Sequence, residues 1–371
     1  MSTKKNKFTK KDFQYMNLAL NLARSRHGLT GPNPSVGCVI VKNDQIISIG
    51  QTSYNGRPHA EYNALKNSYE KLEGSKMYIT LEPCNHYGIT QPCTSIIIKN
   101  KISEVFFSIE DIDKKVSGKS FKILKSRNIS VKKNLLKNEV HNFYKPYFFN
   151  RKNKMPYVTG KIAISKNNLI YNQKKTRITD PHSDRLTHFL RYKNDSLMIS
   201  SKTLNIDNPK LNCRIKKLSR FSPNRVILDK NLEMKITSYI FKTANKKNTI
   251  VFYNYADKSK ILSFKKKGIH LIKVNLNKKK YFDLKLILKK LYILGCRNLL
   301  VEGGNNLTTS FLKRRFFNEF YLFKSPKILS KRVYYKNFNS FKVLSKNYKN
   351  KSKINTRLGK DSITLYNKQY V

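Results

Sequence analysis

One histidine, one glutamate and two cysteines in the first third of the chain limit the folds it can adopt. His59 and Glu61 lie in the segment PHAEYNAL, and Cys84 and Cys93 enclose the segment CNHYGITQPC. His59 and the two cysteines can share one ion only if the fold brings the two segments together. Three such ligands with a fourth position left for water are typical of catalytic rather than structural zinc. The sequence therefore predicts a catalytic zinc site where the segments meet.

Glu61 is the expected proton carrier of this site. Zinc lowers the pKa of bound water to about 7, and a neighbouring glutamate can move the proton while the water attacks an amidine carbon. The pattern H-x-E followed by P-C and a second cysteine is the signature of zinc-dependent base deaminases. A histidine such as His59, taken alone, is more often a surface or core residue without a catalytic role. Together with Glu61, Cys84 and Cys93, however, it predicts hydrolytic deamination.

The same residues indicate where two helices begin. Residues two positions apart do not share a face of a regular helix, so His59 and Glu61 are expected at a helix start, with Pro58 just before it. Pro92 before Cys93 indicates a second start. Thiols near helix N-termini ionise easily, as zinc ligands must.

The residues between the cysteines suggest a family. RNA adenosine deaminases keep these cysteines two residues apart, whereas CNHYGITQPC resembles the C-x-H-x-G-x-T-x-P-C loop of the bifunctional RibD family of riboflavin biosynthesis. The upstream segment GPNPSVGCVIV, residues 31–41, resembles the substrate-binding PNP-x-VG segment of that family. The downstream segment VEGGNNL extends the resemblance over nearly the whole chain.

The resemblance implies two enzymes in one chain. A zinc-dependent deaminase domain, residues 1–148, would act on 2,5-diamino-6-ribosylamino-4(3H)-pyrimidinone 5′-phosphate. A reductase domain, residues 149–371, would then use NADPH to convert the ribosyl group to the ribityl chain. The implied fold class is α/β, with a cytidine-deaminase-like three-layer sandwich followed by a dihydrofolate-reductase-like domain.

Apolar patterning predicts alternating helices and strands in both halves of the chain. In the first half we expect a helix over 13–23, strands over 36–41 and 46–49, a helix from 59 to about 72, a strand over 77–81, a helix over 92–99 and a strand over 105–109. In the second half we expect strands over 157–164, 197–200, 225–228, 249–253 and 299–301, and helices over 185–192 and 284–294. The domain boundary is expected between residues 141 and 156, as a linker or a docked helix end. The lysine-rich stretch 331–355 is expected to consist largely of loops. Elements alternating in this way indicate a three-layer sandwich with the zinc between two helix starts.

A second site is indicated by VEGGNNLTTSFL, in which a strand ends at Glu302 and two glycines precede a helix. Such glycines let the backbone approach a phosphate at a helix N-terminus, although an ordinary strand-to-helix turn has the same pattern. By resemblance, the cofactor contacts are Ala163, Arg177, Thr203, Asp207, Gly304, Asn305, Asn306, Leu307, Thr308, Thr309 and Ser310. By the same resemblance, the substrate contacts are Asn33, His86, Lys175, Arg191, Leu211, Arg214 and Glu302. Arginine suits phosphate because its fork pairs bidentately, but either arginine could also be a solvated charge.

The chain departs from the family at four places. The family's S-x-D-G segment is here residues 165–168, SKNN, and its tryptophan over the cofactor is Arg177. The basic residue between Gly and Thr of the cysteine loop is Ile89, and the Pro-Asn-Pro after Asp111 is residues 112–114, IDK. The zinc ligands are all present, so the alternative within enzymes is a deaminase with an inactive reductase-like domain.

The charge of the chain favours polyanions. The 371 residues include 76 Lys and Arg against 22 Asp and Glu, a formal charge of +54. Such a charge is typical of proteins that bind nucleic acid, and a deaminase of nucleic-acid bases is the alternative it suggests. The lysines are spread along the whole chain, however, as in drift toward AT-rich codons. We therefore expect salt-sensitive, non-specific binding to polyanions and no specific nucleic-acid partner.

Three further expectations concern location, cysteines and metal. The chain has no run of 18 apolar residues and no apolar N-terminal signal, so a cytoplasmic protein without membrane contact is expected. Cys38, Cys213 and Cys296 are scattered, which argues against a disulfide framework. A purely structural zinc would need a fourth ligand, for which His86 is the nearby candidate. Oligomeric state is left open, a homo-oligomer included.

Overall fold

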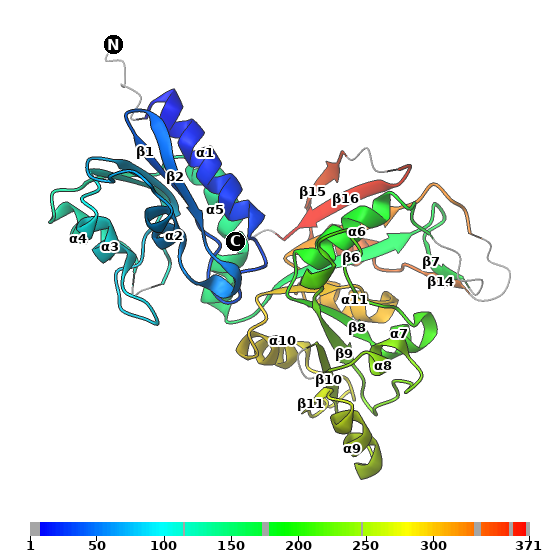
Figure 1. Ribbon diagram of the computed structural model, residues 1–371. Helices are drawn as coiled ribbons and strands as arrows, with labels where there is room; N and C mark the ends of the chain where they lie inside the picture. Colours follow the sequence, from blue (N-terminus) through cyan, green and yellow to red (C-terminus); the bar gives the residue numbers. More distant parts are fainter. Residues whose placement is uncertain are drawn as a thin grey trace. The chain divides into compact units, whose positions relative to one another are not determined.

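The computed structural model describes residues 8–113, 116–172, 178–245, 248–329, 335–355 and 359–368. The chain forms two compact units, Met1–Lys154 and Met155–Val371 (Figure 1). The division expected after residue 148 falls inside helix α5, Lys137–Asn153, which belongs to the first unit. No helix within the described ranges is both long and apolar enough to cross a membrane.

A five-stranded sheet forms the centre of the first unit. Its strands, in spatial order, are β2 (Gln45–Gln51), β1 (Gly37–Lys42), β3 (Lys76–Leu81), β4 (Glu104–Ile109) and β5 (Ser130–Lys133). Strand β1 is antiparallel to β2 and β3, while β3, β4 and β5 are parallel to one another. The carboxyl ends of the three parallel strands therefore meet at one edge, where ligand sites of such sheets commonly lie.

Helices cover both faces of this sheet. They are α1 (Lys10–Ser25), α2 (Ala60–Lys66), α3 (Cys93–Lys99), α4 (Lys119–Lys125) and α5. Because successive strand residues point to opposite faces, Val39 and Val41 pack with Met16 of α1, while Ile40 packs with Ala64 of α2. The predicted three-layer α/β sandwich is confirmed.

The structure corrects one expectation in the first unit and decides between the two alternatives given for its end. Helix α2 ends at Lys66 instead of near residue 72, and just beyond it the Ser68 hydroxyl accepts a hydrogen bond from the backbone N–H of Glu70 at 3.3 Å. Such a local bond offers the backbone an alternative to the helix. The stretch around 141–156 is a helix end rather than a linker, since α5 runs to Asn153 and buries Val140 and Tyr144.

A nine-stranded sheet forms the centre of the second unit. Its spatial order is β11 (His270–Lys273), β10 (Thr249–Tyr253), β9 (Asn224–Leu228), β8 (Ser196–Ser200), β12 (Asn298–Val301), β6 (Tyr157–Ile164), β13 (Glu319–Lys324), β16 (Ser362–Asn367) and β15 (Asn350–Ile354). The strands from β11 to β13 are parallel, and β16 is antiparallel to both of its neighbours. A separate pair joins β7 (Leu169–Asn172) and β14 (Tyr335–Asn337).

The helices of the second unit enclose two apolar clusters, one on each side of the sheet. They are α6 (Ser183–Tyr192), α7 (Ser201–Asp207), α8 (Tyr239–Lys242), α9 (Lys258–Lys266), α10 (Leu284–Ile293), α11 (Asn305–Lys313) and α12 (Phe341–Asn347). The expectation of a loop-rich stretch over 331–355 is wrong for its described part, which holds β14, α12 and β15. Leu344 and Tyr348 are buried there, so apolar anchoring outweighs the lysine-rich composition.

Candidate active sites

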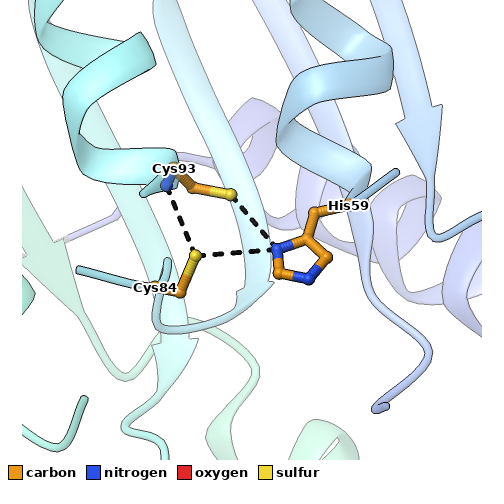
Figure 2. A group of neighbouring side chains, drawn as sticks. All are labelled: His59, Cys84 and Cys93. Carbon is orange, nitrogen blue, oxygen red and sulfur yellow. Dashed lines mark hydrogen bonds between the residues drawn. The ribbon is translucent and has the colours of Figure 1, made fainter. Parts of the chain in front are cut away.

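The three predicted zinc ligands converge in the first unit. His59 is the N-cap of α2, Cys93 is the first residue of α3, and Cys84 lies in the loop after β3. Their ligand atoms all lie within 4.8 Å of one another. His59 Nδ1 is 3.4 Å from the Cys93 sulfur and 3.6 Å from the Cys84 sulfur. Figure 2 shows the three side chains pointing toward one another. Both predicted helix starts are confirmed.

The electrostatics of this cluster prepare it for a cation. The Cys84 sulfur accepts a hydrogen bond from the backbone N–H of Cys93 at 3.3 Å. Hydrogen bonds from the Cys93 thiol, from His59 and from that N–H lower the pKa of Cys84 to about 4. The Cys84 sulfur is therefore a thiolate at neutral pH, which is the form that binds metal.

The donor set fits catalytic zinc. Two sulfurs and one imidazole nitrogen are ligands that zinc prefers, and three protein ligands leave one position open. No fourth His, Cys, Asp or Glu of the described chain joins the cluster. His86 lies on the wall of the same cavity, but its Nδ1 is buried without a partner and it is not part of the cluster. The geometry thus favours the catalytic over the purely structural zinc site.

Glu61 lies in the first turn of α2, beside the ligand cluster and 4% exposed. It lines a cavity of about 120 Å³ together with His59 and Cys84. Burial raises the pKa of the Glu61 carboxyl, because the charged form loses its solvation there. A carboxyl with a raised pKa is a stronger base, and general acid–base catalysis commonly uses carboxyls shifted in this direction.

Asn33 and His86, the two substrate contacts expected in the first domain, both line this cavity. The Asn33 side chain donates a hydrogen bond to the Gly56 carbonyl oxygen at 3.0 Å. This bond connects the PNP segment to the residues just before α2, so Asn33 has a fixed orientation at the cavity wall.

Several cavity residues were missed by the sequence analysis. Glu82 accepts hydrogen bonds from the backbone N–H groups of Asp111, Gly118 and Ser120 at 3.0 to 3.2 Å. Tyr147 of α5 donates its hydroxyl to Asp111 at 3.0 Å. A carboxylate directly after the apolar strand β3 is the signal that could have identified Glu82. Nothing in the local sequence connects residue 147 to the other side of this cavity.

The second site is a cavity of about 560 Å³ at the carboxyl ends of β8 and β12. Eight of the residues expected there line it: Ala163, Thr203, Asp207, Glu302, Gly304, Asn305, Asn306 and Leu307. Gly304 is the N-cap of α11, and a Cβ atom at this position would lie 3.3 Å from the Thr203 hydroxyl oxygen. The glycine therefore keeps the space between the starts of α7 and α11 open.

Other expected contacts lie away from this cavity. Thr308, Thr309 and Ser310 follow in α11 and do not line it, because the helix turns their side chains elsewhere. The Thr308 hydroxyl donates to the Gly303 carbonyl oxygen at 3.2 Å. Leu211 is buried, Arg214 is exposed, and neither lines the cavity. Lys175 and Arg177 lie outside the described residues.

Arg191 and Glu302 contact each other directly. Two hydrogen bonds of 2.7 Å join the Nε and Nη2 atoms of Arg191 to the two carboxylate oxygens of Glu302. The side chains are only 11% and 14% exposed. Burial alone would raise the pKa of Glu302, but Arg191 and then Lys161 outweigh it, so this pKa is lowered. In the structure Arg191 thus orients Glu302 instead of facing the open cavity, where we expected a phosphate contact.

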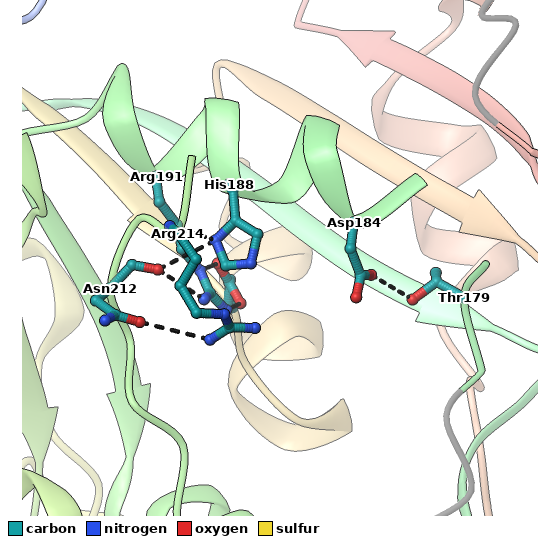
Figure 3. Close-up of polar contacts among 7 residues, drawn as sticks. Thr179, Asp184, His188, Arg191, Asn212 and Arg214 are labelled. Atoms are coloured by element: carbon teal, nitrogen blue, oxygen red, sulfur yellow. Dashed lines mark hydrogen bonds and ion pairs between the residues drawn. The ribbon is translucent and has the colours of Figure 1, made fainter. Parts of the chain in front are cut away.

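Arg191 also belongs to a polar group that includes Asn212 (Figure 3). The Nη1 atom of Arg191 donates to the Asn212 carbonyl oxygen at 3.1 Å, and Arg214 donates to the Asn212 side chain at 3.4 Å. His188 accepts a hydrogen bond from the Arg214 backbone N–H at 3.3 Å. The two arginines expected to bind substrate are therefore near each other, although only Arg214 is exposed.

Lys161 is a further cavity residue that the sequence analysis missed. It lies in β6, and burial lowers its pKa while the charge of Glu302 opposes that shift. A lysine in the middle of the apolar strand 157–164 is costly unless it has a partner, and this was an available signal.

Comparisons with known proteins agree with this division into two sites. The chain matches the family models "Cytidine and deoxycytidylate deaminase zinc-binding region" over residues 9–109 and "RibD C-terminal domain" over residues 156–353. It is 35% identical to the riboflavin biosynthesis protein RibD of Aquifex aeolicus, over 86% of this chain and 88% of that protein. It is 33% identical to RibD of Buchnera aphidicola subsp. Baizongia pistaciae, over 95% and 97% of the two chains.

Solved structures agree over the whole length. The structure of Acinetobacter baumannii RibD is similar with a TM-score of 0.84 at 26% identity, covering 97% of this chain and 99% of that one. The diaminohydroxyphosphoribosylaminopyrimidine deaminase/5-amino-6-(5-phosphoribosylamino)uracil reductase of Thermotoga maritima is similar with a TM-score of 0.82 at 26% identity and the same coverage. The chain therefore belongs to the RibD family of riboflavin biosynthesis and is a bifunctional enzyme with a zinc-binding deaminase domain and an NADPH-dependent reductase domain.

Proposed function

We propose that the first domain deaminates 2,5-diamino-6-ribosylamino-4(3H)-pyrimidinone 5′-phosphate and that the second reduces the ribosyl group of the product. The Thermotoga relative is named for a deaminase and a reductase of this kind. The observation that supports the proposal most strongly is the convergence of His59, Cys84 and Cys93 beside the buried carboxyl of Glu61.

In the deaminase site, His59, Cys84 and Cys93 would hold the zinc. When bound, zinc supplies the Lewis acidity that makes water nucleophilic at neutral pH. Glu61 takes a proton from the attacking water and passes it to the departing amino nitrogen, so that one water is consumed and one ammonia leaves. The raised pKa of Glu61 suits it to both transfers. Asn33 and His86, on the cavity wall, are the proposed pyrimidine contacts.

In the reductase site, the residues around Gly304 would hold NADPH, which supplies a hydride when bound. The backbone at the start of α11 has unpaired N–H groups that suit a phosphate oxygen. Ala163, Thr203 and Asp207 are the proposed neighbours of the cofactor. Glu302, held by Arg191, and Lys161 are the proposed neighbours of the ribose, with Lys161 as the proton donor.

We also propose Leu211 and Arg214 as substrate contacts, from the family resemblance, with both lying outside the cavity lining. The exposed Arg214 guanidinium donates one hydrogen bond, to the Asn212 side chain at 3.4 Å, so its other N–H groups can pair with a phosphate. Lys175, Arg177 and Thr308 to Ser310 stay predictions from the family resemblance. The cytoplasmic location stays a prediction from the sequence, and the oligomeric state stays open.

One incubation tests both halves of the proposal. Purified protein is mixed with the diamino-pyrimidinone substrate, with and without NADPH, and the products are identified by mass. We expect the exchange of one amino group for oxygen in both samples and the addition of two hydrogens only with NADPH. A deaminated product that is never reduced would assign the second domain no catalytic role. Glu61→Gln is the control, because it should abolish the first change of mass.

A further inference from the structure

Acidic side chains outnumber arginines and lysines on the wall of the deaminase cavity. Four carboxylates line it, those of Glu61, Glu82, Asp111 and Asp113. A substrate with a 5′-phosphate is repelled by these groups unless a cation lies where the phosphate binds. Among the described residues, the only arginines or lysines on the cavity wall are Arg57 and Arg151.

The two arginines have different surroundings. The Arg151 guanidinium lies 5.2 Å from the centre of the Tyr147 ring, and the Tyr147 hydroxyl binds Asp111. Arg151 also lowers the pKa of Asp111, against the larger effect of burial. The charge of Arg151 is therefore partly balanced by the acidic wall of the cavity.

Arg57 has no comparable anionic neighbour. Its Nη1 atom donates to the Thr90 hydroxyl at 2.6 Å, and none of the carboxylates in the described residues lies within 4 Å of its guanidinium. Its remaining N–H groups are available for a ligand. An arginine fork of this kind suits two oxygens of one phosphate.

Arg57 lies against the loop between the two cysteines. A Cβ atom at Gly88 would be 3.5 Å from the Nη2 atom of Arg57, so the guanidinium lies close to this part of the loop. Ile89 is 87% exposed and contributes no charge. Arg57, in the segment before α2, therefore places a positive charge beside Gly88 and Ile89, where the loop between the cysteines has no arginine or lysine of its own.

We propose that Arg57 binds the 5′-phosphate of the deaminase substrate and thereby selects phosphorylated over unphosphorylated substrates. This inference rests on the proposed function of the first domain and adds the residue that recognises the phosphate. Arg57 contacts no reacting atom in this proposal. Its removal should therefore raise KM for the phosphorylated substrate and leave kcat nearly unchanged.

The test compares two substrates, the 5′-phosphate and the corresponding unphosphorylated riboside. Arg57→Met removes the charge and keeps an unbranched side chain. Losing a hydrogen-bonded charge pair should lower kcat/KM for the phosphate by about 10- to 100-fold and leave the riboside nearly unaffected. Arg57→Lys should recover part of the loss. Arg127→Met, at an exposed arginine outside the cavity, is the matched control and should change neither substrate.

Each outcome decides the inference. If Arg57→Met keeps the wild-type preference for the phosphate, or if the wild type deaminates both substrates equally well, Arg57 does not select phosphate. If the variant loses riboside deamination in parallel, Arg57 acts by holding the loop at Thr90, which also overturns the inference. In all three cases deamination by the wild type still supports the proposed function. Failure of the zinc-loaded wild type to deaminate either substrate would instead refute the proposed function and, with it, this inference.

Discussion

The ion pair between Arg191 and Glu302 allows a quantitative prediction about the second domain. We consider Arg191→Leu, which leaves the Glu302 carboxylate in place without its bidentate partner. Removing one member of a buried pair costs about 3 to 5 kcal/mol. Lys161 remains as a countercharge near Glu302, so we expect the lower end of this range, about 3 kcal/mol.

A loss of this size is measurable by calorimetry of the full chain. For a domain of about 200 residues it corresponds to a fall of roughly 6 to 12 °C in the melting temperature of the second unit. Arg185→Leu, at an exposed arginine of the same helix α6, is the matched control and should shift the transition by little.

The pH dependence gives a second check. The pKa of Glu302 is lowered in the folded protein, so the stabilisation is fully present above the unfolded pKa of about 4.3 and is lost as pH falls through the folded pKa. In Arg191→Leu the pKa of Glu302 rises, because the main opposite charge is gone. The difference in stability between wild type and variant should therefore shrink as the pH falls below about 5.

A double variant separates the ion pair from packing. Arg191→Leu with Glu302→Leu removes both charges of the pair, and replacing such a pair by apolar residues is often neutral or stabilising. Because Lys161 then loses the Glu302 charge that opposes its burial, we expect the double variant to regain only part of the loss. A double variant as unstable as Arg191→Leu, or a single variant within about 1 kcal/mol of wild type, would refute the reasoning.

Three further predictions concern the two sites. Cys84→Ser should lower zinc content well below the one ion per chain expected for wild type, and full occupancy in metal analysis would contradict the ligand assignment. Glu61→Gln should keep its zinc and lose about 10²- to 10⁴-fold in deamination rate, whereas a near wild-type rate would remove Glu61 from the mechanism. Gly304→Val should narrow the space beside Thr203 and weaken NADPH binding about tenfold in a direct titration, with deamination unchanged; undiminished binding would place the cofactor elsewhere.

The sequence predicted the zinc site because its chemistry is local. His59 and Glu61 are two residues apart, and Cys93 follows a proline that marks the start of a helix, so short segments already contain most of the geometry. The apolar patterns of residues 157–164 and 249–253 likewise predicted strands, and β6 and β10 have the expected bounds. The end of α2 could not be predicted, because Leu72 packs against the core although it lies beyond the last helical residue, Lys66.

The second site was less predictable because its key contact is distant in sequence. Arg191 and Glu302 are 111 residues apart, and nothing in either local segment indicates that they pair. The family resemblance identified both residues but suggested separate contacts with the substrate. Only the three-dimensional arrangement shows that Arg191 holds Glu302. The same reason explains why Tyr147, on a helix far from Asp111 in sequence, was missed.

The excess of basic residues makes the acidic ones more informative in this chain. With 76 Lys and Arg and only 22 Asp and Glu, an arbitrary surface region should contain several cations for each anion. The first cavity instead has four carboxylates and two arginines on its wall. Burying carboxylates without a function is costly, and drift toward lysine codons does not place them in a cavity. The clustering of scarce acids around Glu61 therefore argues for a working deaminase site, and it also makes a cation such as Arg57 necessary wherever a phosphate binds.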